Sequence, residues 1–105
     1  MTLRSHEELT ASLVDVLDEQ AQAPDEFYRG CAAALEWVTG QRSTAPVSGD
    51  AGQRAGEAAM NAELAAAIAM LHGERPIPTP LRRGYLSGVE ATLAWVLGQT
   101  EEPPL

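Results

Sequence analysis

The chain has 105 residues, which is enough for one domain with a single modest hydrophobic core. Hydrophobic residues make up 45% of the chain and charged residues 21%, a balance that excludes wholesale disorder. The formal net charge of −8 argues against direct binding to nucleic acid or to an anionic membrane. The chain contains 18 alanines and no lysine. Because alanine is the best helix former, we expect an all-α fold.

The first predicted helix covers residues 5–21. Ser5 fits its N-cap position, and Glu8, three residues later, completes a capping box. The residues expected to face the core follow at helical spacing and are Leu9, Leu13, Val16 and Leu17. Seven acidic residues and no arginine occur between Ser5 and Glu26, so the opposite face of this helix is expected to be acidic.

The second predicted helix covers residues 24–39. Pro24 suits the first position of a helix, and Gly40 suits the left-handed residue that ends one. Because only a very short turn separates it from the first helix, we expect an antiparallel hairpin over residues 5–40. Residues 41–56 are rich in Pro, Ser, Thr and Gly and lack apolar periodicity, so they predict a flexible linker.

A second helical hairpin is predicted over residues 57–98. Its first helix covers residues 57–72. The apolar face of that helix consists of Met60, Leu64, Ile68 and Leu71. An extended connector follows, since a residue before a proline is pushed out of the helical region. Thr79 suits an N-cap with Pro80 at the first helical position, so the last helix is expected over residues 79–97.

The two hairpins resemble each other in sequence. Residues 27–41 (FYRGCAAALEWVTGQ) and residues 85–99 (YLSGVEATLAWVLGQ) share seven identities in fifteen positions. The identical residues are Gly30, Ala33, Leu35, Trp37, Val38, Gly40 and Gln41, which recur as Gly88, Ala91, Leu93, Trp95, Val96, Gly98 and Gln99. In the helices that precede them, Val14 and Leu17 correspond to Ile68 and Leu71. The sequence therefore predicts a four-helix bundle built from two similar αα-hairpins, all within one domain.

Each repeated helix carries a stripe of small residues that ends in a tryptophan. The stripes are Gly30, Ala33 and Trp37 in one helix, and Gly88, Ala91 and Trp95 in the other. Together with the larger apolar residues beside it, each stripe gives an apolar arc of roughly 200°, too wide for one neighbouring helix to cover. We expect these two helices at the centre, packed against each other or against a second copy of the chain. In the second case the stripes form the self-association surface of a homodimer.

The end of the chain carries a family resemblance. The pattern aromatic-x-x-Gly-x-x-x-x-Leu-x-Trp-Val-x-Gly-Gln, followed by an acidic tail, resembles the C-terminal helix of small uncharacterised all-α proteins from actinobacteria and their phages. The resemblance covers about the last 25 residues. It implies an origin, while that group carries no activity to transfer.

The residues that could support catalysis or metal binding do not occur in suitable patterns. A metal site in a helical bundle uses Glu-x-x-His pairs, and neither His6 nor His72 has a glutamate three residues before it. Cys31 lies on the large-residue face of its helix and is expected to be a buried, unreactive thiol. There is no phosphate-binding glycine loop. We therefore expect no catalytic residue, no metal and no cofactor.

Two charged clusters are candidates for interaction with a partner. Arg75, Arg82 and Arg83 lie within nine positions; they would contact an anion or an acidic partner, or else Glu74 or the acidic first helix. On the first helix, Glu8, Asp15 and Glu19 share one side. They would imitate a row of phosphates toward a basic protein, or form a solvated face.

These features predict a non-enzymatic protein that acts through protein–protein interaction or as a regulator. Neither a secretion signal nor a membrane span is recognisable, so we expect it in the cytoplasm, bound to a protein partner. The alternative is an acidic inhibitor of phage type, directed at a defence protein or imitating nucleic acid toward a basic protein that binds it. A third class, a bundle that holds a small ligand between its central helices, requires a cavity.

Overall fold

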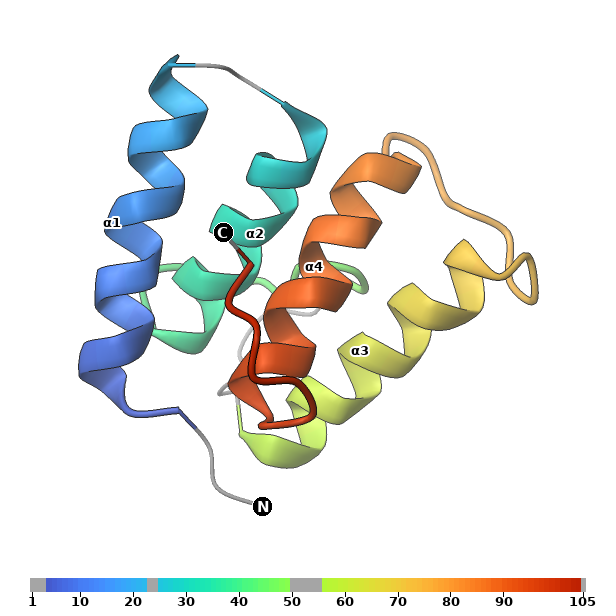
Figure 1. Ribbon diagram of the computed structural model, residues 1–105. Coiled ribbons are helices and arrows are strands. Elements are labelled where there is room, and N and C mark those ends of the chain that lie inside the picture. The colour runs from blue at the N-terminus through green and yellow to red at the C-terminus, as the bar shows by residue number, and fades with distance from the viewer. Residues whose placement is uncertain (1–3, 23–24, 50–55, 105) are drawn as a thin grey trace.

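A computed structural model describes residues 4–22, 25–49 and 56–104. It contains four helices: α1 (His6–Gln22), α2 (Glu26–Val38), α3 (Glu57–Leu71) and α4 (Arg83–Val96) (Figure 1). The helices pack as a bundle, which confirms the predicted all-α, four-helix fold. Successive helices reverse direction along the chain (Figure 1).

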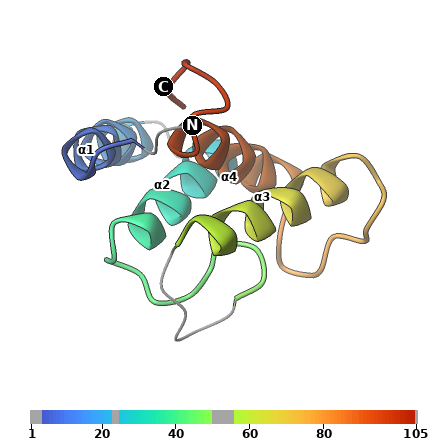
Figure 2. The ribbon, with the colours of Figure 1, turned by 90° about the horizontal axis from the view of Figure 1, so that it is seen from below.

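The helices α2 and α4 form the centre of the bundle. They make the most extensive contact between helices, while α1 packs on α2 and α3 packs on α4. Consequently α1 and α3 lie on opposite sides of the central pair (Figures 1 and 2). The largest fully buried side chains include Leu35 of α2 and Leu86 and Leu93 of α4. The core is therefore mainly aliphatic, with Trp37 and Trp95 also buried in it, and lies around the central pair.

Two glycines allow the central helices to touch. A Cβ atom on Gly30 would overlap the carbonyl oxygen of Tyr85 and lie 2.9 Å from its carbonyl carbon. A Cβ atom on Gly88 would overlap the carbonyl oxygen of Phe27 and lie 2.9 Å from the backbone nitrogen of Cys31. Phe27 and Gly30 correspond in sequence to Tyr85 and Gly88, so the crossing is reciprocal. Of the two packings expected for the small-residue stripes, the structure shows contact within one chain.

The predicted helix ends are largely observed. The Ser5 hydroxyl accepts a hydrogen bond from the Glu8 backbone N–H at 3.2 Å and donates one to the Glu8 carboxylate. Just after the C-terminal ends of α2 and α4, Gly40 and Gly98 have φ values of +85° and +75°, the left-handed conformation that glycine adopts without strain. Asp25 caps α2 by accepting the Phe27 N–H at 2.7 Å, so the helix begins at Glu26 and the expected start at residue 24 was wrong. Pro24 itself lies outside the described residues.

The start of α4 differs from the prediction. Thr79 and Pro80 lie in a turn closed by a hydrogen bond from the Leu81 N–H to the Pro78 carbonyl at 2.8 Å. The helix begins at Arg83, after an extended N-cap residue, Arg82. Leu81 packs against the core, so the connector is anchored there before the helix can start. The prediction that Thr79 is the N-cap was therefore wrong.

Part of the predicted linker carries tertiary contacts. In its described portion, residues 41–49, Ala45, Pro46 and Val47 are buried. The buried Glu63 carboxylate accepts hydrogen bonds from the Val47 and Ser48 backbone N–H groups at 2.8 and 3.0 Å. The Tyr85 hydroxyl donates to the Pro46 carbonyl at 2.7 Å. These contacts attach the segment to α3 and α4, whereas its sequence predicted a flexible linker; residues 50–55 lie outside the described residues.

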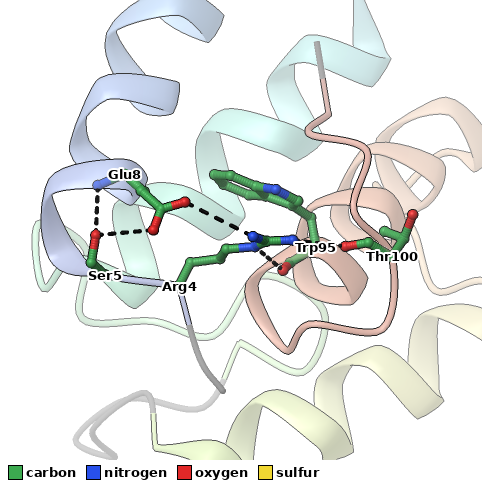
Figure 3. Close-up of polar contacts among 5 residues, drawn as sticks. All are labelled: Arg4, Ser5, Glu8, Trp95 and Thr100. Carbon is green, nitrogen blue, oxygen red and sulfur yellow. Dashed lines mark hydrogen bonds and ion pairs between the residues drawn. The ribbon is translucent and has the colours of Figure 1, made fainter. Parts of the chain in front are cut away.

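Arg4 joins the two ends of the fold (Figure 3). Its guanidinium donates to the carbonyls of Trp95 and Thr100, both at 3.1 Å, and lies 5.3 Å from the centre of the Trp95 ring. It also forms an ion pair with Glu8 at 3.9 Å. Arg4 thus supplies donors and positive charge to the C-terminal end of α4, where carbonyl groups lack partners within the helix.

Candidate functional site

The outer face of α1 exposes two large apolar side chains. Val14 is 54% exposed and Leu17 is 43% exposed, and these are the exposed large hydrophobic residues of the described chain. Leu17 was predicted to face the core, which is wrong. Among the other helices, α1 makes extensive contact only with α2. Its buried face is therefore narrow and consists of Leu9, Ser12, Leu13 and Val16.

The equivalent residues of the second hairpin are covered. Ile68 and Leu71, which correspond in sequence to Val14 and Leu17, are half-buried and pack against the core. Ile77 of the longer connector packs there as well. The first hairpin has no connector of that length. Ile68 and Leu71 are therefore packed against the core of the chain, while Val14 and Leu17 on α1 are exposed to solvent.

Acidic side chains surround the apolar pair on α1. Asp15, Asp18 and Glu19 are exposed, and α1 contains no arginine. Glu8, the third member of the acidic row predicted with Asp15 and Glu19, is bound to Ser5 and Arg4 (Figure 3). All three acids of that row are exposed, but only Asp15 and Glu19 are not engaged by Ser5 or Arg4. We call the exposed surface formed by Val14, Leu17, Asp15, Asp18 and Glu19 the α1 outer face.

The predicted self-association residues lie inside the chain. The four residues Gly30, Ala33, Trp37 and Gly88 are buried, as is Trp95; Ala91 is half-buried. The Trp95 ring lies against Arg4. These residues therefore serve packing within the single chain described here, and little of their surface is left for a second copy.

The three clustered arginines separate in the structure. Arg83 donates to the Leu71 carbonyl at 2.7 Å and so binds the end of α3, a partner that neither sequence interpretation named. Arg75 is exposed in the connector. Arg82 lies at the N-cap of α4 and lines an open groove.

That groove brings together residues that the sequence analysis did not connect. Arg29 of α2, Arg42 of the following segment, and Arg82 and Tyr85 of the α4 start line it together. Leu17 lies at the same groove, so the groove adjoins the α1 outer face. Its arginines come from three separate segments of the chain, so no local pattern in the sequence reveals the set; only Arg82 was a candidate from the sequence.

The remaining reactive groups are sequestered. Burial raises the pKa of the Cys31 thiol above its ordinary value of 9.0, and its Sγ lies 3.7 Å from the Gly88 carbonyl. Burial also raises the pKa of Tyr85. Within the described ranges, no three histidine, cysteine, aspartate or glutamate residues are grouped as metal ligands would be. No helix in that part of the chain has the length and apolar character needed to cross a membrane.

Comparison of the chain with protein-family models, with curated proteins and with solved structures finds no match.

Proposed function

We propose that the protein is a non-enzymatic, cytoplasmic interaction protein that binds another protein through the α1 outer face. The observation that supports this most is the exposure of Val14 and Leu17, while Ile68 and Leu71, their sequence counterparts, are covered within the chain. Exposed apolar side chains that are adjacent and rimmed by polar residues are typical of protein interaction sites.

The charges around the apolar pair indicate the chemistry of the partner. Asp15, Asp18 and Glu19 give the face one sign of charge, so a complementary partner carries apolar residues flanked by arginine or lysine. The apolar pair would supply affinity by burial, and the acids would accelerate encounter and select the partner.

The alternative function, an acidic inhibitor that imitates phosphates, depends on the acids alone. Asp15 and Glu19 are exposed and could contact a basic protein, whereas Glu8 is held by Arg4 and Ser5. Two free carboxylates make a short imitation of a phosphate row. We therefore favour binding centred on Val14 and Leu17.

The proposal is tested by affinity capture with matched variants. The tagged protein and the double variant Val14→Ser/Leu17→Ser would be used to capture proteins from a lysate of a high-GC actinobacterium, with mass spectrometry of the eluates. We expect a partner captured by the wild type to be lost with this variant. The control, Ala62→Ser/Ala65→Ser, changes two exposed residues of α3 and should retain it.

The acids are tested in the same experiment by a charge-matched pair. Asp15→Asn/Glu19→Gln removes two charges from α1, and Glu101→Gln/Glu102→Gln removes two from the exposed tail. Loss of the partner with the α1 charge variant, together with full retention by Val14→Ser/Leu17→Ser, would refute the apolar face and support the inhibitor. Equal retention by every variant would exclude α1 as the binding surface.

A further inference from the structure

The arginine-lined groove described above has the size of a small-molecule site. Its volume is about 730 Å³, within the range of a few hundred to a thousand Å³ that is usual for ligand pockets. Its lining includes the apolar side chains of Pro80 and Leu81 beside the arginines. A groove of mixed chemistry suits a ligand with one charged end and one apolar end.

Two arginines act on the Tyr85 phenol, and a third lines the same groove. Arg82, the N-cap residue of α4, and Tyr85 in the first turn both line the groove. The positive charges of Arg42 and Arg29 also reach the Tyr85 phenol, where they counteract part of the rise in its pKa that burial causes. Three of the seven arginines of an acidic protein therefore line one groove.

Two of these arginines lack a carboxylate partner. Arg29 is paired with Glu26 at 3.0 Å, and Glu36 also lines the groove. In the described ranges, no carboxylate forms an ion pair with Arg42 or Arg82. Arg82 also lies at a helix N-terminus, which disfavours positive charge and has no side-chain cap. A bound anion would offset this unfavourable charge.

We propose that this groove binds a small organic anion, with its carboxylate or phosphate group held by Arg42 and Arg82 and its apolar part against Pro80 and Leu81. Arginine is suited to this role because its planar guanidinium donates two parallel hydrogen bonds to either group. The site adjoins the α1 outer face at Leu17, but the arginines that hold the anion lie outside that face, so anion binding is a second activity of the protein.

The experiment is a titration of the full-length, ¹⁵N-labelled protein followed by NMR, with phenyl phosphate, benzoate and neutral benzyl alcohol as probes. We expect saturable shifts of the Arg42 and Arg82 side-chain resonances with at least one anion, with Kd below about 1 mM. Benzyl alcohol should bind at least about tenfold more weakly, because it lacks the charge. The tighter of the two anions identifies the group that the site prefers.

Variants locate the site. Arg82→Gln and Arg42→Gln should each weaken binding of the preferred anion by about tenfold. The control Arg75→Gln removes an equally exposed charge outside the groove and should bind as the wild type does. The amide spectra of all three variants report whether the fold is retained.

Three results would overturn the site. The first is the absence of saturable shifts with both anions at about 10 mM, and the second is benzyl alcohol binding as tightly as the preferred anion. The third is that Arg75→Gln weakens binding of that anion as much as Arg82→Gln does. Because none of these measurements involves a protein partner or the residues Val14 and Leu17, failure of the site would leave the proposed protein interaction standing.

Discussion

Adding a single methyl group at Gly88 tests the packing of the central helices. In Gly88→Ala the new Cβ would overlap the Phe27 carbonyl and lie within 2.9 Å of the Cys31 nitrogen. Both neighbours are backbone atoms, so α2 and α4 must move apart. Overpacking of this kind costs up to about 3 kcal/mol, while replacing a helical glycine by alanine contributes about 1 kcal/mol. The net loss is therefore about 2 kcal/mol.

The assay is thermal unfolding followed by circular dichroism. A loss of about 2 kcal/mol lowers Tm by about 8–16 °C in a domain of this size. Gly30→Ala should behave alike, because its Cβ meets the Tyr85 carbonyl. Gly84→Ala is the control: its Cβ would lie 3.0 Å from the Glu26 Cβ and farther from backbone, so its Tm should fall by less. A Gly88→Ala variant as stable as the wild type would refute the close crossing.

Three further changes test other contacts. Glu63→Leu removes the acceptor for two backbone N–H groups and should lower the free energy of unfolding, measured by urea denaturation, by about 3 kcal/mol. Glu63→Gln keeps an acceptor oxygen and should lose only about half as much free energy. In the same assay, Arg4→Ala should lower the free energy of unfolding by about 1–2 kcal/mol, because it removes the hydrogen bonds to two carbonyls and the contact with the Trp95 ring. Arg75→Ala is the control and should change the free energy of unfolding by almost nothing. Equal losses in the two variants would contradict this account. Since burial raises the pKa of Cys31, the folded thiol resists ionisation, so stability should fall as pH rises above 9.0. Cys31→Ala should reduce that slope, by at most about 1.4 kcal/mol per pH unit, and an unchanged slope would exclude the thiol as its cause.

The helices and their central pair could be predicted from sequence because their signals are local. Apolar spacing and glycine stops predicted α1 and α3 to within one residue at each end. The start of α4 was misplaced because Thr79 and Pro80 suit a turn as well as a helix start. The sequence contains no local signal that decides between them; anchoring of Leu81 in the core does.

The missed features depend on contacts between distant residues. Ala45, Pro46 and Val47 are too few to show a periodicity, and their burial depends on Glu63 and Tyr85. Glu63 lies in an alanine-rich helix, where the sequence alone predicts that an acidic side chain faces solvent. The groove arginines likewise come from three segments. Leu17 is exposed because only α2 packs extensively on α1. The spacing of apolar residues does not show how many helices will cover a given helix.

The central claim, that the α1 outer face binds a protein partner through its apolar pair, is tested most directly by the salt dependence of capture. Wild type and Val14→Ser/Leu17→Ser would be compared at about 0.05 M and about 0.5 M salt, where screening lengths differ about threefold. We predict one partner that the wild type retains at both salt concentrations and that the variant loses at both. A partner lost from the wild type at high salt and unaffected by the variant, or recovery of the protein alone as a salt-resistant oligomer, would contradict the claim.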